Sequence, residues 1–372
     1  MNGHTLVTGY PRLLARRLAE SFRSRRPEGR VSVLAHEKHA EAAAGFARGI
    51  GAEVLVGDIS SLHLGLSTVE YRDAVRTVTD VLHAAEWSFL GATLAEMRRV
   101  NVEGTRAALD LAADCRKLRR FTHFSTVYVS GDREGVVAED ELACGQAFRN
   151  AFEQTKFEAE VLARSAMSTL PCTVLRPSIL VGDTKTGEID RFEGPYVVAI
   201  LLVTSPLQVA VPLPGNGVAP LNVVPIDYVV SAASHIHDDE RAVGRTFHLA
   251  DPNPSSSRRI YELIAERQGK KLPRLSLGYR VADAILRLPG LEKLTREQRA
   301  AIAYVNHLSF FSTRGTLEIL DGTGIRCPPI DSVTSSSSST VRPSRRLANV
   351  SSSTESRGAG TSEINASAAS IR

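Results

Sequence analysis

Cysteine is scarce in this chain of 372 residues, which has only four. They stand far apart, at Cys115, Cys144, Cys172 and Cys327. Such isolated positions exclude the paired spacings of a zinc site and of a disulfide framework. We therefore expect reduced thiols in a cytoplasmic protein and no bound metal.

A large excess of charge of one sign is lacking as well. The chain has 45 basic and 41 acidic residues, which gives a formal net charge of +4. The basic residues are dispersed along the sequence and are expected to solvate helix faces. A charge so small and so spread out does not build a polyanion-binding surface, so we expect no nucleic-acid partner.

Long uninterrupted hydrophobic runs are also absent. The most apolar stretch, 196–213, contains Pro206 and Pro212, and a membrane-spanning helix is not expected across two prolines. The segment is predicted to line a buried apolar pocket, with shallow contact at a membrane surface as the alternative. The first residues lead straight into a predicted strand, so no signal peptide is expected.

What the sequence does contain is a repeated alternation of strand-length apolar runs with helix-period segments. Strands are predicted at 4–8, 31–35, 53–56, 81–84, 120–125 and 173–176. The main helices between them are predicted at 13–24, 41–50, 97–115 and 148–165. This alternation is typical of an α/β fold with a doubly wound parallel sheet, which places its binding loops at the carboxyl ends of the strands.

The pattern changes after residue 184, where prolines, glycines and short apolar pieces become common. Residues 185–331 are assigned to a smaller substrate-binding lobe that shares some core elements. Helices at 257–268, 279–288 and 296–305 are predicted to form its lid. Residues 332–372 include five consecutive serines and few large apolar side chains. Such a tail cannot offset its ordering entropy, so it is predicted to be disordered.

The turn between the first strand and the first helix carries a modified glycine motif, Thr8-Gly9-Tyr10-Pro11-Arg12-Leu13-Leu14-Ala15. It resembles the Thr-Gly-x-x-Gly-x-x-Gly turn of extended short-chain dehydrogenases. The resemblance implies a dinucleotide-binding Rossmann core over residues 1–184, with Thr8, Gly9, Arg12 and Leu13 at the pyrophosphate. Ala15 adds one methyl group at the third glycine position. Arg12 replaces the second glycine, so either its guanidinium reaches the phosphate or the turn binds poorly.

Four further segments resemble cofactor-binding elements of the same superfamily, in the same order. Asp58 and Ile59 stand where adenine is read, and His83-Ala84-Ala85 leaves small side chains beneath the cofactor. Asn101 opens an Asn-Val-x-Gly-Thr helix start, at which the family's asparagine fixes the central strands. Arg176-Pro177-Ser178 ends a strand where the family's backbone meets the nicotinamide carboxamide.

A narrower resemblance links the chain to fatty acyl-CoA reductases and thioester reductase domains. The segments that carry it are 57–67, 125–131, 176–183 and 222–229, and it extends over about residues 4 to 330. That branch prefers NADPH and reads its 2′-phosphate from the tip of the second strand. Here His36 stands at that tip, which has no acidic residue to hold a 2′-hydroxyl, so NADP is expected, with NAD as the alternative.

The catalytic motif of the superfamily is Tyr-x-x-x-Lys on one helix face, with a Ser or Thr from a strand end. The resemblance places the catalytic slots at Thr126, Phe152 and Lys156. Phenylalanine keeps the aromatic ring of the missing tyrosine but has no proton to give, so acid catalysis is expected to be weakened. Tyr128 and Glu153 are nearby residues that could supply an acid, but the sequence does not locate their side chains.

Three functions are compatible with these residues. The first is an NAD(P)H-dependent reductase of fatty-acyl, other thioester or carbonyl substrates, CoA-linked or carrier-linked, with segment 196–213 as an acyl channel. The second is a Rossmann binding or sensor protein that has lost its chemistry, favoured by Arg12, Ala15 and Phe152. The third, a sugar epimerase or hydroxysteroid-type dehydrogenase, depends more heavily on the missing phenol.

Overall fold

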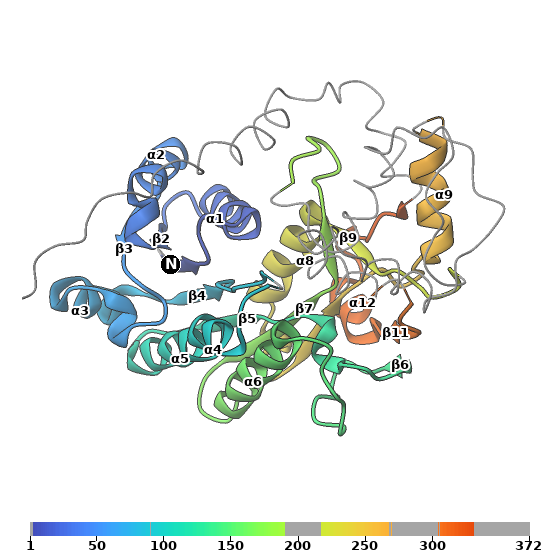
Figure 1. The fold of residues 1–372 in the computed structure, drawn as a ribbon. Helices are drawn as coiled ribbons and strands as arrows, with labels where there is room; N and C mark the ends of the chain where they lie inside the picture. Colours follow the sequence, from blue (N-terminus) through green and yellow to red (C-terminus); the bar gives the residue numbers. More distant parts are fainter. Residues whose placement is uncertain are drawn as a thin grey trace, which may run out of the picture.

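A computed structural model of the chain describes residues 3–89, 91–189, 217–267, 269, 304 and 306–330. Its centre is a seven-stranded, wholly parallel sheet in the order β10-β7-β5-β4-β1-β2-β3 (Figure 1). The strands are β1 (His4–Thr8), β2 (Arg30–Ala35), β3 (Glu53–Val56), β4 (Asp80–His83), β5 (Arg120–Phe124), β7 (Cys172–Pro177) and β10 (Thr246–Leu249). The predicted doubly wound α/β fold is confirmed.

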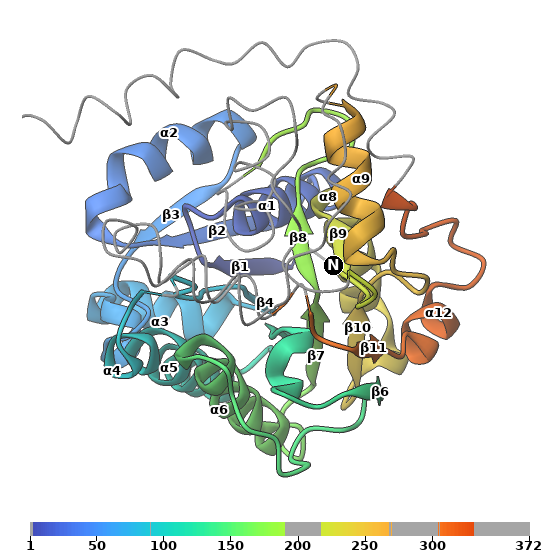
Figure 2. The same ribbon diagram turned by 45° about the vertical axis from the view of Figure 1, so that its right-hand side comes forward.

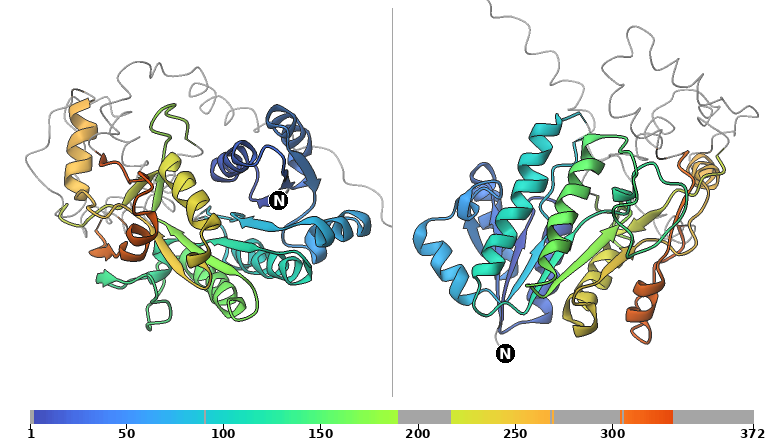
Figure 3. Two further views of the ribbon diagram at one scale, coloured as in Figure 1. Left: turned by 180° about the vertical axis from the view of Figure 1, so that it is seen from behind. Right: turned by 90° about the horizontal axis from the view of Figure 1, so that it is seen from below.

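Helices cover both faces of this sheet, which is why its strands read as nearly continuous apolar runs. One face carries α1 (Leu13–Arg25), α2 (Ala40–Ile50) and α8 (Ile226–Asp238). The other carries α3 (Thr68–Thr77), α4 (Leu94–Arg98), α5 (Gly104–Asp114) and α6 (Ala151–Ala166) (Figures 2 and 3). Every residue of β1, β4, β5 and β7 is buried, whereas the edge strand β3 is partly exposed.

The structure departs from the predicted elements in several places. The predicted helix 97–115 is α4 and α5 joined by a π-helical turn at Arg99–Glu103. The helix predicted from residue 148 begins at Ala151, because the Asn150 side chain accepts from the Glu153 backbone and caps it there. Helix α8 and strand β10 were not predicted, and both pack onto the large sheet although they follow residue 184.

The remaining elements form a smaller lobe beside β7 and β10. They are β6 (Gly135–Val137), β8 (Ile179–Val181), β9 (Val223–Pro225), α9 (Ser257–Arg267), β11 (Ser309–Phe311) and α12 (Arg314–Leu320). Strand β8 pairs with β9, and β6 pairs with β11. The apolar segment 196–213, the predicted helices at 279–288 and 296–305 (apart from residue 304) and the tail lie outside the described residues. The division at residue 184 stays a prediction.

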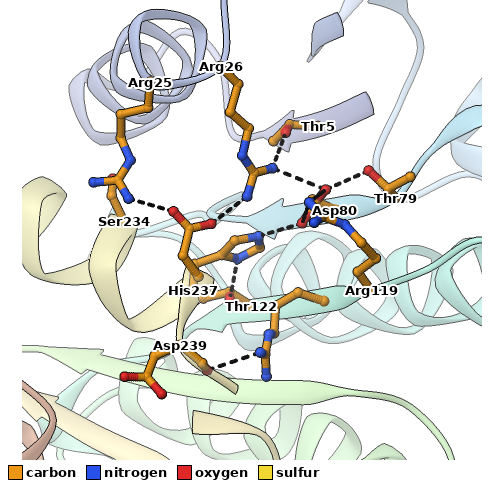
Figure 4. A network of polar contacts seen from close by, with 12 residues as sticks. Thr5, Arg25, Arg26, Thr79, Asp80, Arg119, Thr122, Ser234, His237 and Asp239 are labelled. Atoms are coloured by element: carbon orange, nitrogen blue, oxygen red, sulfur yellow. Dashed lines mark hydrogen bonds and ion pairs between the residues drawn. The ribbon is translucent and has the colours of Figure 1, made fainter. Parts of the chain in front are cut away.

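A buried carboxylate ties the amino-terminal edge of the sheet together (Figure 4). Asp80 opens β4 and lies 2.7 Å from Arg119, 3.1 Å from Arg26 and 3.1 Å from Nε2 of His237. Burial lowers the pKa of His237, so its ring is neutral: Nε2–H donates to Asp80, and Nδ1 accepts from Thr122 at 2.8 Å. The network joins β4, β5, α1 and α8 at the edge opposite the binding loops.

Within the described part of the chain, no helix combines the length and the apolar character needed to cross a membrane.

Acid should destabilise this fold from about pH 6.5 downward. Six buried histidines have pKa values lowered by burial: His4 (to about 4), His83 (to about 3), His307 (to about 4), His123, His237 and His248. Below pH 6.5 these histidines bind protons in the unfolded chain, whereas in the folded chain they stay neutral until the pH approaches their lowered pKa values. Each such histidine then removes up to about 1.4 kcal/mol of stability per pH unit, down to its folded pKa.

Urea unfolding at intervals between pH 7.5 and 4.5 measures this dependence. Replacing His123, whose two ring nitrogens have no hydrogen-bond partner among the described residues, with Phe should flatten the curve. A free energy of unfolding that stays constant from pH 7 to 5 would contradict the neutral state of these rings.

Candidate active site

The carboxyl ends of the central strands meet around one cavity of about 200 Å³. The loop after β1 contributes Arg12 and Leu13, and the loop after β4 contributes Ala84, Glu86 and Ser88. The ends of β5 and β7 and the start of α6 complete the wall with Ser125, Thr126, Tyr128, Phe152, Pro177 and Ser178. The structure thus brings residues predicted for cofactor binding and for catalysis to one place.

The turn after β1 keeps the geometry of a phosphate-binding turn despite its altered glycines. Gly9 has a φ of +105°, and a Cβ there would lie 2.6 Å from the carbonyl oxygen of Ala84. Only glycine can therefore approach the neighbouring loop so closely. Helix α1 begins at Leu13 with no acidic residue in its first turn and with no side-chain cap from the described residues, so its first N–H groups are suited to an anion. Ala15 is fully buried, so its extra methyl group is accommodated.

The Arg12 side chain reaches across the cavity to the loop after β4. One of its terminal nitrogens lies 3.1 Å from the Ser88 hydroxyl and 3.7 Å from the Glu86 carboxylate. The other Glu86 oxygen lies 3.4 Å from the ammonium of Lys156. Arg12, Glu86 and Lys156 therefore form a cation–anion–cation bridge with a formal charge of +1. Glu86 was not singled out in the sequence, although it directly follows the His83-Ala84-Ala85 motif.

The expected adenine end lies in a tightly folded loop after β3. A Cβ on Gly57 would lie 2.3 Å from the carbonyl oxygen of Leu64, and one on Gly65 would lie 2.7 Å from the Asp58 nitrogen. Neither position has room for a Cβ, which explains why both residues are glycines. The loop holds Asp58, whose Oδ1 accepts from the Ser60 backbone N–H at 2.9 Å and from its hydroxyl at 2.7 Å.

His83 and Asn101, which were predicted to bind the cofactor, hold loops in place and do not line the cavity. His83 is fully buried; its Nδ1 pairs with the Thr8 hydroxyl at 2.9 Å and its Nε2 with the Thr105 hydroxyl at 3.0 Å. Asn101 accepts from the Trp87 backbone N–H at 2.6 Å and donates to its carbonyl at 3.1 Å. Both residues therefore fix the loop after β4, and neither lines the cavity.

The tip of β2 is closed by a short 3-10 turn. His36 caps this turn, because its Nδ1 accepts from the Lys38 backbone N–H at 3.2 Å. The ammonium of Lys38 lies 5.9 Å from the centre of the Trp87 ring. Lys38 thereby places a positive charge between the tip of β2 and the loop after β4. Ile59 lies in the loop after β3 and packs against Gly104. A Cβ on Gly104 would lie 3.2 Å from the Ile59 side chain.

Of the residues predicted to be catalytic, Thr126 lines the cavity, whereas Lys156 lies beside it, next to the lining residue Glu86. Lys156 is 2% exposed, and its ammonium donates to the Phe124 carbonyl at 2.6 Å. The Thr126 hydroxyl accepts from the Tyr128 backbone N–H at 3.3 Å, which leaves its own proton for a ligand. Ser125 instead donates its proton to Glu160 at 2.6 Å. Phe152 lies in the cavity wall, one helical turn before Lys156.

Arg176 does not line the cavity, unlike Pro177 and Ser178 after it. Its guanidinium is 1% exposed and contacts Glu160 at 2.7 Å, the His248 ring at 3.0 Å and the Glu141 carbonyl at 2.7 Å. The Arg176 charge holds the pKa of Glu160 below its ordinary value despite the opposing effect of burial. This residue therefore braces α6 against β7. The Ser178 hydroxyl is buried without a hydrogen-bond partner in the described residues, as a ligand-contacting group can be.

Tyr304, from the smaller lobe, also lines the cavity and had no signal in the sequence. Its hydroxyl accepts from the Asn150 amide at 2.9 Å. No group of three or more His, Cys, Asp or Glu side chains in the described ranges is arranged to hold a metal ion.

Comparison with known proteins gives consistent matches. The family model described as male sterility protein, an NAD-binding family, matches residues 16–233, more than half of the chain. A linear gramicidin synthase of Brevibacillus parabrevis is 23% identical over 296 residues, which are 74% of this chain and 6% of that protein. Fatty acyl-CoA reductase wat of Drosophila melanogaster is 26% identical over 207 residues, 48% of this chain and 40% of that protein.

Among solved structures, the terminal R domain of the myxalamid PKS-NRPS pathway is similar over 90% of this chain and 89% of that one, with a TM-score of 0.77 and 25% identity. The chain spans well under half the length of the two curated relatives. These matches confirm the resemblance to the reductase branch of extended short-chain dehydrogenases.

Removing the charge of Glu160 should cost about 3–5 kcal/mol of stability, because the buried Arg176 guanidinium is left uncompensated. Glu160→Gln tests this by denaturant unfolding. Glu158→Gln is the matched control on the same helix. Its carboxylate pairs with the half-exposed Arg98, so the expected loss is below about 1 kcal/mol. Equal losses in the two variants would show that the Arg176–Glu160 pair does not brace α6.

Proposed function

This chain belongs to the male sterility protein family, and from that premise we propose that it reduces a fatty-acyl or related thioester with a nicotinamide dinucleotide. The observation that carries the proposal is the cavity at the carboxyl edge of the sheet. There the Thr126 hydroxyl lies in the same wall as the apolar side chains of Leu180, Val181 and Ile226. A polar end beside an apolar wall suits a reactive carbonyl attached to a hydrocarbon chain.

Residues of this chain fit a nicotinamide dinucleotide. The uncapped start of α1 and the Arg12 guanidinium would face the pyrophosphate, and Asp58 the adenine. The unpartnered Ser178 hydroxyl and the ammonium of Lys156 would hold the nicotinamide end. When bound, the reduced nicotinamide supplies a hydride. Glu86 fits less obviously, but its pairing with two cations leaves the cleft positive, as phosphates require.

The residues around the carbonyl then act by positioning and by stabilising charge. Thr126 donates its free proton in a hydrogen bond to the substrate oxygen, which becomes an oxyanion as hydride arrives. Lys156 adds a positive charge near the same end of the cavity. Because Phe152 has no hydroxyl, the acid catalysis of the family's tyrosine is absent from this position, and the rate contribution of about 10²–10⁴-fold has to come from elsewhere or be lost.

We further propose NADPH as the preferred reductant. His36 stands at the tip of β2 and is followed by Glu37 and Lys38, so the tip position itself carries no acidic residue to hold a 2′-hydroxyl, although Glu37 is adjacent. The ammonium of Lys38, beside Trp87, offers a cation for a 2′-phosphate. The thioester itself would be carried by CoA or by a carrier protein. All four cysteines are free thiols, which supports a cytoplasmic site of action.

A second candidate is a binding or sensor protein without turnover. Two observations favour it: the Arg12–Glu86–Lys156 bridge crosses the cleft, and Phe152 takes the place of the catalytic phenol. An epimerase or hydroxysteroid-type dehydrogenase is the weakest candidate, since it needs that phenol to move a proton on an alcohol.

The purified protein should oxidise NADPH when given an acyl-CoA or carrier-bound acyl thioester and should release an aldehyde or alcohol. The assay follows NADPH absorbance across a panel of chain lengths, with product detection by mass spectrometry. Fluorescence titration of NADPH runs in parallel. Tight binding without turnover on any thioester would support the sensor function, and the absence of any binding would remove both candidates.

Lys38→Ala should weaken NADPH binding by about tenfold, the typical size of one lost phosphate contact, and leave NADH binding nearly unchanged. The physical reason is that only NADPH carries the 2′-phosphate. Nicotinamide fluorescence measures both dissociation constants. Arg25→Ala is the control, because this arginine pairs with Asp238 at the far end of α1. An equal loss for both nucleotides would show that Lys38 does not read the phosphate.

A further inference from the structure

The cavity contains a phenol that the family's catalytic motif does not include. Tyr128 follows β5 and stands two residues after Thr126, and its side chain lines the same cavity as Thr126 and Phe152. The residue is 7% exposed, so its ring is almost wholly within the protein. Its ring packs edge-on against Tyr304 at 4.6 Å and Phe311 at 5.8 Å between centroids, which fixes the ring in place.

The Tyr128 hydroxyl has no hydrogen-bond partner among the described residues, although almost every other candidate acid in the cavity has one. The Ser125 hydroxyl donates a hydrogen bond to Glu160, and the Tyr304 hydroxyl accepts from the Asn150 amide and is also hydrogen-bonded to the Glu153 carboxylate. Glu86 is held between two cations. The phenol oxygen keeps some accessible surface in the cavity, so a ligand there can reach it.

Burial and two charged groups act on the proton of Tyr128. Burial raises its pKa above the ordinary value, which holds the proton on the phenol more tightly and opposes its donation. The Arg149 guanidinium lies 5.8 Å from the ring centre and favours the phenolate once the proton has left. Glu153 opposes this, but its carboxylate is bound to Arg149 at 2.8 Å and lies 0% exposed on α6. Glu153 is thus a partner of Arg149 and of the Tyr304 hydroxyl, and its side chain does not line the cavity.

We propose that Tyr128 is the catalytic acid of this protein and supplies the proton that Phe152 cannot. The proposal rests on the thioester reductase function proposed above. The two positions belong to different elements, Phe152 to the first turn of α6 and Tyr128 to the loop after β5, yet both meet the cavity. The phenol is thereby relocated from the helix to the strand end that also carries Thr126.

In the reduction step, the substrate carbonyl carbon accepts a hydride pair from the reduced nicotinamide and forms a C–H bond, while the π pair of the C=O bond moves to oxygen. That oxygen takes the Tyr128 proton as the phenol O–H bond breaks. The product is a neutral hemithioacetal, and the phenolate regains a proton from solvent. The hydroxyl of the hemithioacetal then loses its proton as the C=O bond forms again, and the C–S bond breaks with its electron pair on sulfur. The sulfur takes up a proton, so an aldehyde and a thiol are released.

Five variants of the full chain test the proposal: Tyr128→Phe, Phe152→Tyr, the double variant, Tyr304→Phe and Tyr71→Phe. Tyr128→Phe should lower kcat for thioester reduction by about 10²-fold or more and leave NADPH binding unchanged. The double variant should recover at least about tenfold of that loss, because it restores a phenol on α6. Tyr71→Phe is the control for loss of a phenol oxygen, since its hydroxyl bonds Asp114 outside this cavity.

A binding measurement without turnover provides the second readout. Without NADPH, calorimetry compares an acyl-CoA ketone analogue, which keeps the carbonyl, with a thioether analogue, which lacks it. The wild type should bind the ketone about tenfold more tightly through the Tyr128 hydroxyl, and Tyr128→Phe should remove most of that preference.

The outcomes separate the two proposals. Wild-type turnover that survives in Tyr128→Phe, with the ketone preference intact, overturns the role of Tyr128 and leaves the reductase function standing. A large loss in Tyr304→Phe but not in Tyr128→Phe assigns the acid to the other phenol and likewise overturns it. A wild type that binds NADPH but reduces no thioester ends the function and the acid assignment together.

Discussion

The buried ion pair between Glu160 on α6 and Arg176 on β7 is the contact on which the geometry of the candidate site depends. Glu160 also accepts the Ser125 proton, so one carboxylate joins α6 to the ends of β5 and β7. Lys156 lies one turn earlier on the same helix and donates to the Phe124 carbonyl. Charges buried this deeply hold their partners in one arrangement, because any displacement leaves one of them uncompensated. The helix that carries Phe152 and Lys156 is fixed over the sheet edge in this way.

The altered phosphate turn is compatible with the same architecture. Gly9 is the glycine that backbone geometry requires, and Ala15 is buried without conflict. Arg12 does not fold back over its own turn: its guanidinium extends to Glu86 and Ser88 on the opposite loop. In the family's motif, the second glycine lets the backbone approach the phosphate. Arg12 at this position instead brings a charged side chain to the cavity. Its effect depends on Glu86, which stands 74 positions later in the sequence.

Of the three positions that correspond to the family's catalytic residues, two keep the family's residue type and one does not. The family's lysine and hydroxyl donor are present at Lys156 and Thr126, and the aromatic ring is kept at Phe152. Phe152 keeps the shape of the tyrosine ring but has no hydroxyl proton to donate. Tyr128 brings a phenol to the same cavity from a neighbouring loop, at a position that the smaller lobe encloses through Tyr304 and Phe311. Residues of the main sheet and of the smaller lobe thus surround the phenol together.

By itself, the sequence determined six of the seven strands of the large sheet, most of the helices between them and the order of the cofactor motifs, because apolar periodicity and glycine turns are local properties. It also indicated Lys156 and Thr126 as candidate catalytic residues, since their spacing is a property of one helix and one strand end. Only the tertiary structure decided that Arg176 points into the core, that Glu86 joins Arg12 to Lys156, and that Tyr128 meets the cavity. Which side chains of a loop face the cavity depends on contacts with residues that are distant in the sequence. A buried charged side chain likewise points toward an opposite charge that only the fold places beside it.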